Sequence, residues 1–158
     1  MPKLLKFFFF LVATSLPLFF IWFNWGQSAY QDLIAGVIVP LAKPLGQRQL
    51  NMFYAKSHYM NIVPFVTLML AVPALGWKKR VWGILIGFGL LFIWHLVFSL
   101  TLNHFQLLWG ADRRFYRFYI PAVSLNSTLP VLVWCGLAWS GVKELLKEIF
   151  VRQNGEHL

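Results

Sequence analysis

The sequence is poor in charge and in cysteine, and its few charges are mostly of one sign. Only 12% of its 158 residues are Asp, Glu, Lys or Arg, against about 25% in a typical soluble domain. Five acidic residues oppose fourteen basic ones, which gives a formal net charge of +9 at pH 7. The single cysteine, Cys135, excludes an internal disulfide. So few charges in a chain that is 59% hydrophobic also exclude a disordered chain and a soluble nucleic-acid-binding protein.

The apolar residues come in long runs with few charges inside them. Four runs approach the ~20 residues that a helix needs to cross about 30 Å of hydrocarbon; they cover residues 7–25, 59–77, 81–102 and 119–142. Residues 29–50 carry apolar side chains at helical spacing, with prolines that interrupt the pattern. This predicts a short helix that lies along the outer interface or re-enters the membrane shallowly. We therefore predict an all-α polytopic membrane protein with one domain, residues 1–158, four transmembrane helices and an outer interfacial helix.

Basic residues beside short loops give the orientation. Lys3 and Lys6 precede the first run, residues 78–80 (KKR) separate the second from the third, and Lys143 and Lys147 follow the fourth. Basic residues near short loops favour the cytoplasm, so both termini are predicted to be cytoplasmic. No small-residue cleavage site follows the first run, which favours an uncleaved signal anchor.

The third run contains Gly83 and Gly87, a pair of small residues four positions apart. Such a pair lets another helix approach closely, because no side chain stands between the two backbones. We interpret the pair as a packing feature.

Several polar residues are predicted to lie within the hydrocarbon, where an unpaired polar group is costly. His95 and Asn126 each lie about seven residues from the outer end of their runs, and Thr67 lies about eight residues into its own. Pro130 has no N–H to donate to the carbonyl of Asn126, which is therefore free. The candidate polar pocket comprises His95, Asn126, Thr67, Ser99 and Ser127.

Three interpretations of these polar residues stay open. They can hydrogen-bond across helices and hold the bundle together. They can line a pocket that opens outward and takes a lipid headgroup or a peptide segment. They can form a catalytic site, although no carboxylate is predicted at the depth of His95 to orient or activate it. No catalytic residue is assigned.

A second group of polar residues is predicted in the outer loops. Arg113 and Arg117 share a face if this stretch is helical, and aromatic residues lie between them. The pattern is typical of an anchor in the headgroup layer, and it also suits a cleft for a carboxylate, a phosphate or a sorting peptide. The candidate outer-face anion or partner site comprises His58, His104, Arg113, Arg114 and Arg117.

Neither a metal nor a cofactor is predicted. His58 and His104 have no Cys, Asp or Glu nearby that would complete a zinc site. A haem with two histidine ligands needs two deep histidines, and only His95 is deep.

Residues 57–65 (SHYMNIVPF) and 70–80 (LAVPALGWKKR) resemble the small membrane proteins associated with exosortase H. Across about residues 30–130 the order of segments is similar to that of the exosortase/archaeosortase family. In true exosortases an outward-facing Cys, an Arg and a His are assigned to the cleavage of a C-terminal sorting signal. Here no Cys lies near Ser57, Cys135 lies toward the cytoplasmic half, and His95 and Ser99 stand where the family places its Arg. The resemblance therefore implies a partner or a non-catalytic relative of a sorting enzyme.

We expect a non-catalytic accessory protein of the bacterial inner membrane, in contact with lipids and with a larger exosortase-like enzyme that sorts proteins for surface export. One alternative is a histidine-centred membrane enzyme for a lipid-linked or peptide substrate, using His58, His95 or His104 with Arg113 or Arg117. Another is a small transporter or lipid-binding subunit in which the interfacial helix gates a pocket. No nucleic-acid partner is expected.

Overall fold

The computed structural model describes residues 2–47, 53–73 and 75–155, with side chains up to residue 150, and every regular element in these ranges is helical. The prediction of an all-α protein is therefore confirmed. The elements are α1 (Lys3–Ile21), the π-helical turn η1 (Trp22–Gly26), α2 (Gln27–Ala42), α3 (Phe53–Lys56), the 3-10 turn η2 (Tyr59–Asn61), α4 (Ile62–Ala71), α5 (Trp77–Trp109), α6 (Arg113–Leu137) and α7 (Trp139–Gly155).

In the described part of the chain, three helical stretches are long and apolar enough to cross a membrane. They are Lys3–Ala42, which α1, η1 and α2 form together, Trp77–Trp109 and Arg113–Leu137. This finding confirms the prediction of a membrane protein with transmembrane helices.

The predicted run 59–77 differs from the structure. It contains η2 and the ten-residue α4, which extends about 15 Å, half of the hydrocarbon thickness. The helix ends because Val72 adopts an extended conformation (φ −66°, ψ 110°). Val72 precedes Pro73, and the proline ring disfavours a helical conformation in the residue before it. Residue 74 lies outside the described residues, and the next helix begins at Trp77 instead of residue 81.

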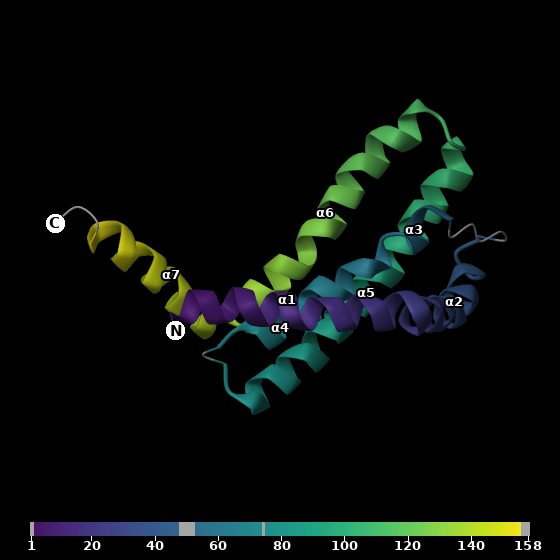
Figure 1. Cartoon of the computed structure of the whole chain (residues 1–158). Helices are drawn as coiled ribbons and strands as arrows, with labels where there is room; N and C mark the ends of the chain where they lie inside the picture. Colours follow the sequence, from purple (N-terminus) through teal and green to yellow (C-terminus); the bar gives the residue numbers. More distant parts are fainter. Residues whose placement is uncertain (1, 48–52, 74, 156–158) are drawn as a thin grey trace.

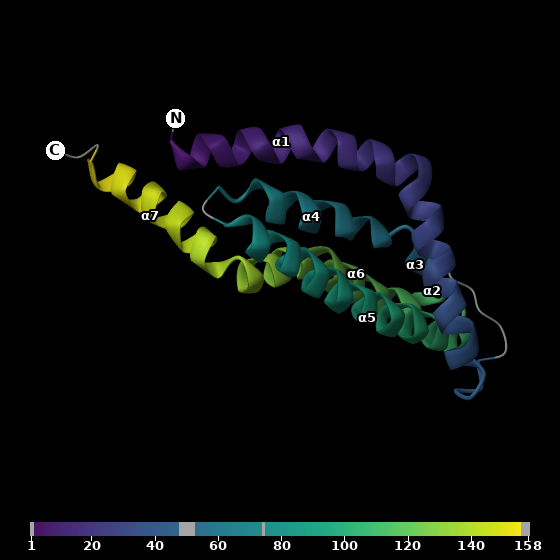
Figure 2. The same cartoon turned by 90° about the horizontal axis from the view of Figure 1, so that it is seen from below.

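The predicted first span and the predicted interfacial helix are joined in one helical stretch. The π-helical turn η1 continues α1 directly into α2, and the helix axis bends there, so that α2 runs across the bundle (Figure 2). A π-helical turn is a recognised cause of such a bend. The predicted segment 29–50 corresponds mainly to α2, which ends at Ala42, while residues 48–50 lie outside the described residues.

The predicted span 119–142 is shifted toward the N-terminus, to α6 (Arg113–Leu137). Asp112 begins this helix, since its Oδ1 accepts hydrogen bonds from the backbone N–H groups of Arg114 at 2.7 Å and Phe115 at 3.0 Å. An Asp at the N-cap satisfies donors that have no partner inside the helix. The segment predicted to be an outer loop, residues 103–118, is therefore mostly helical: residues 103–109 end α5, and residues 113–118 are the first turns of α6.

The loops gather at two ends of the bundle. The N-terminus, the α4–α5 turn and the start of α7 lie at one end, and α2, α3 and the α5–α6 turn lie at the other (Figures 1 and 2). At the first end, Lys3 Nζ lies 2.7 Å from Glu144 Oε2, an exposed ion pair that joins α1 to α7.

Helix α4 lies inside the bundle, where it packs against α1, α5 and α6. Its Phe65 and Met69 side chains are fully buried. A Cβ atom added to Gly87 would meet the Phe65 ring, and one added to Gly83 would meet the Met69 side chain. The close approach that this glycine pair predicts is thus confirmed, and its partner is α4.

Candidate functional site

Two residues of the predicted polar pocket, His95 and Ser99, lie one turn apart on the buried face of α5. The Tyr30 hydroxyl from α2 lies 2.8 Å from His95 Nδ1. The Tyr59 hydroxyl from η2 lies 2.6 Å from Ser99 Oγ, and Ser99 Oγ donates to the backbone carbonyl of His95 at 2.6 Å. Both tyrosine rings contact the imidazole, with centroid separations of 5.7 and 5.0 Å. We call these four residues the His95 cluster; it fastens α2 and η2 to α5.

The His95 cluster lies in the buried interior of the bundle. His95 is 0% exposed. Its Nε2 is buried and has no hydrogen-bond partner within the described ranges. Nor does any carboxylate or thiol hydrogen-bond to the imidazole there, so the ring lacks the acidic partner that orients a general base in catalytic triads. The hydrogen bonds of the cluster join α2 and η2 to α5.

Asn126, which is 1% exposed, is the centre of a second cluster on α6. Its Oδ1 accepts from Trp94 Nε1 on α5 at 2.8 Å, and its Nδ2 donates to the backbone carbonyl of His58 at 3.1 Å. Its own backbone carbonyl accepts from Asn61 Nδ2 at 2.8 Å. This carbonyl is free for Asn61 because Pro130 cannot donate, as the sequence indicates. We call Asn126, Trp94, Asn61 and His58 the Asn126 cluster.

The other two residues of the predicted pocket lie elsewhere. Thr67 Oγ1 donates to the carbonyl of Pro64 within its own helix, at 2.9 Å. Phe65 lies against Gly87 and Met69 against Gly83, so Thr67 lies about 15 Å along α5 from His95, and not at the depth of His95 as was expected. Ser127 is exposed and donates to the carbonyl of Val123 on α6, at 2.9 Å.

A small cavity of about 230 Å³ lies beside the Asn126 cluster. Its lining combines residues of both predicted sites with residues that neither contained: Phe19, Ser57, His58, Met60, Asn61, Pro64 and Ser127. Asn61 Oδ1 is buried and has no hydrogen-bond partner in the described part of the chain. His58 Nε2 lies 2.7 Å from the Tyr119 hydroxyl, and burial lowers the pKa of His58, so its imidazole is neutral at neutral pH.

The predicted outer-face site is only partly assembled. The side chains of Arg113, Arg114 and Arg117 are exposed on the first turns of α6 and form no ion pair with any other described residue. His104 is exposed near the end of α5, where its ring contacts the Phe105 ring. Within the described ranges no hydrogen bond connects either histidine to the arginines. The three arginines therefore form an accessible basic surface without the histidines.

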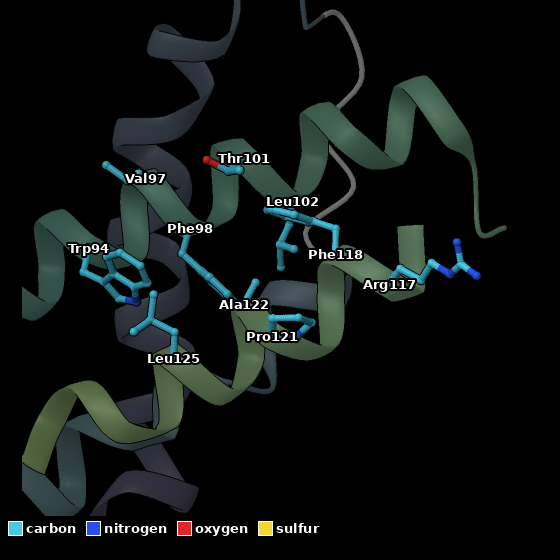
Figure 3. Close-up of a pocket in the computed structure, with 10 residues that line it drawn as sticks. All are labelled: Trp94, Val97, Phe98, Thr101, Leu102, Arg117, Phe118, Pro121, Ala122 and Leu125. Atoms are coloured by element: carbon cyan, nitrogen blue, oxygen red, sulfur yellow. The ribbon is translucent and has the colours of Figure 1, made fainter. Parts of the chain in front are cut away.

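A second cavity, of about 350 Å³, forms a groove between α5 and α6 (Figure 3). Trp94 and Leu125 lie at one end of it, and Phe118 and Arg117 lie at the other. Apart from Thr101 and Arg117 the lining side chains are apolar or aromatic. The lining residues are Trp94, Val97, Phe98, Thr101, Leu102, Arg117, Phe118, Pro121, Ala122 and Leu125.

Reasoning from the sequence missed Tyr30, Tyr59, Asn61 and Trp94, although each bonds to a residue that it singled out. Tyr30 lies in the predicted interfacial segment, and Tyr59 and Asn61 lie at the start of a predicted span, where polar and aromatic residues need no special explanation. Trp94 lies inside the third run and was not singled out. A buried polar side chain needs hydrogen-bond partners, and the sequence reasoning assigned none to His95 or Asn126. That gap is the signal that other polar residues must lie beside them. No family model matches the chain, and no curated protein or solved structure matches it either.

Proposed function

We propose that this chain is a non-catalytic accessory protein of the bacterial inner membrane that works beside an exosortase-type enzyme in protein sorting and surface export. The observation that carries the proposal is that the polar side chains in the interior form hydrogen bonds within this chain. His95, Ser99 and Asn126 are hydrogen-bonded to neighbouring segments, so they hold the bundle in one shape. The exosortase link rests on the resemblance of residues 57–65 and 70–80.

The proposed topology has four membrane segments with both termini in the cytoplasm. Lys78, Lys79 and Lys143 are exposed at the end of the bundle that also holds the N-terminus, which supports a cytoplasmic assignment for that end. In this topology the membrane segments in chain order are α1, then η2 with α4, then α5 and α6. Irregular backbone is tolerated at membrane depth where protein buries it, and Tyr59 is 0% exposed. Helix α2 is then the outer interfacial helix.

The proposed contact with the enzyme is the basic surface at the other end of the bundle. Arg113, Arg114 and Arg117 have exposed guanidinium groups there, which suit a carboxylate or a phosphate on a partner or substrate. Positive charge on the outer side runs against the usual bias of membrane proteins, so a binding role explains it better than topology does.

A cellular sorting assay tests whether the chain performs chemistry. We expect Cys135→Ser to leave processing of a sorting substrate unchanged, because Cys135 lies on α6 away from both clusters and no reaction passes through it. Deletion of the whole chain should impair processing, and the Cys135→Ser variant should restore it. The proposal fails if Cys135→Ser abolishes processing while the protein remains abundant in the membrane.

A further inference from the structure

The groove between α5 and α6 has the size and lining of a binding site. Its volume of about 350 Å³ lies within the ~300–1,000 Å³ range of small-molecule sites. Thr101 and Arg117 are the only lining residues with polar side chains. From Arg117 to Leu125 the groove follows α6 for about 12 Å. Its occupant must therefore be narrow and almost wholly apolar.

Arg117 gives the groove a polar end. Its aliphatic part lines the cavity, and its guanidinium extends past α6 at that end (Figure 3). Long basic side chains take this arrangement where an apolar layer meets a polar one. Arg113 is exposed one turn earlier on the same side of the helix. The Arg117 guanidinium thus lies where the headgroup of an apolar chain in the groove would emerge, and Arg113, one turn away, is near enough along the helix to add a second positive charge.

Trp94 closes the opposite end. Its indole N–H donates to Asn126 Oδ1 at 2.8 Å, so the polar atom of the ring already has a hydrogen-bond partner within the protein. Asn126 is held in turn through its bond to the carbonyl of His58, at 3.1 Å. The buried amide of Asn126 is therefore a positioning residue, which fixes the apolar face that Trp94 presents to the groove.

We propose that this groove binds one acyl chain of an anionic phospholipid, with the lipid phosphate held by Arg117 and Arg113. The apolar lining selects the acyl chain, and the exposed guanidinium groups complement the negative headgroup. The acyl-chain site goes beyond the proposed sorting role. Its headgroup contact shares Arg113 and Arg117 with the proposed enzyme surface, and labelling in vesicles that contain no enzyme tests it separately.

The test uses the full chain in phosphatidylcholine vesicles that contain a minority of phosphatidylglycerol with a photoreactive group in its acyl chain. Labelling should concentrate on residues 94–102 and 117–125. Ala122→Phe fills the groove and should reduce this labelling strongly. Ser124→Phe is the matched control: it places the same ring on the opposite side of α6, about 200° away, and should leave labelling unchanged. The proposal is overturned if both variants label alike, or if labels spread evenly over the exposed apolar faces.

A second variant tests the headgroup contact and leaves the apolar residues of the groove unchanged. Arg117→Gln at this exposed position should lower the preference for phosphatidylglycerol over phosphatidylcholine about fivefold, the effect of one basic residue near an anionic surface. Lys79→Gln, at the other end of the bundle, should leave the preference unchanged. An unchanged preference in Arg117→Gln overturns the headgroup assignment. If inorganic phosphate competes as well as unlabelled phosphatidylglycerol, the anion alone accounts for binding and the proposal fails.

Discussion

Arg80 is a residue for which charge and geometry predict different consequences of substitution. The sequence places it in the basic turn with Lys78 and Lys79, where its charge is the property that orients the chain. In the structure its guanidinium donates to the carbonyls of Leu70 at 2.9 Å, Val72 at 2.6 Å and Leu75 at 2.9 Å. Carbonyls at the end of a helix lack partners within it, so Arg80 bonds to those of Leu70 and Val72 at the end of α4, and also to that of Leu75 in the turn that follows.

Arg80→Lys keeps the positive charge but replaces the planar guanidinium, which has several N–H donors, by a single ammonium group. One ammonium group cannot reach three separate carbonyls as a guanidinium does, so we expect two of the three hydrogen bonds to be lost. A hydrogen bond to a charged group contributes about 1.5–3 kcal/mol. Arg80 is half-buried, so water replaces part of each bond and the lower end of this range applies. Two bonds at about 1.5 kcal/mol each should lower the free energy of unfolding by about 3 kcal/mol.

The assay is denaturant unfolding of the purified protein in mixed micelles, followed by tryptophan fluorescence. Lys79→Gln is the control, since Lys79 is exposed and its loss should change the free energy of unfolding by at most about 0.5 kcal/mol. Arg80→Lys should also leave the orientation of the chain unchanged in a topology reporter. Equal stability of Arg80→Lys and the wild type would refute the assignment of Arg80 as the C-terminal cap of α4.

Two further predictions concern packing and pH. Gly87→Ala should destabilise the protein by about 1–3 kcal/mol, because the added methyl group meets the ring of Phe65, whereas Gly89→Ala enters open space and serves as the control. Burial lowers the pKa of His58, so the unfolded chain binds more protons than the folded one as the pH falls below about 6.5, and stability should decrease there. Unfolding curves between pH 5 and pH 8 test this expectation. His58→Gln should reduce the loss of stability at low pH, and the control His104→Gln should not. If only His104→Gln reduced the loss, the link to buried His58 would be contradicted.

The membrane class and the helical elements could be predicted because they depend on composition and on the period of the apolar residues. The Gly83 and Gly87 contact could also be predicted, since a pair of small residues has a direct steric meaning. The end of α4 at Ala71 could not be read from hydropathy, because Val72 and Pro73 are themselves apolar. The conformational effect of a proline on its predecessor, and not polarity, ends that helix.

The candidate site was predicted only in part, for a different reason. His95 and Asn126 stand out alone because a polar residue in an apolar run is unusual. Their partners Tyr30, Tyr59 and Asn61 come from α2 and η2, far away in the sequence, and long-range pairing leaves no local pattern. The bend at η1 brings Tyr30 to His95, and nothing in the spacing of apolar residues predicts that bend.

The central claim is that the chain assists an exosortase-type enzyme through its outer basic end. Site-specific photo-crosslinking in native membranes tests it, with the reactive group at Tyr116, an exposed position beside the arginines, or at Trp77, exposed at the opposite end. We predict that a photoreactive group at Tyr116 captures an exosortase-type enzyme, identified by mass spectrometry, and that one at Trp77 does not. Replacing both Arg113 and Arg117 by Gln should reduce the yield at Tyr116. Recovery of no such enzyme from Tyr116, or cleavage of a sorting substrate by the purified chain alone, would contradict the account.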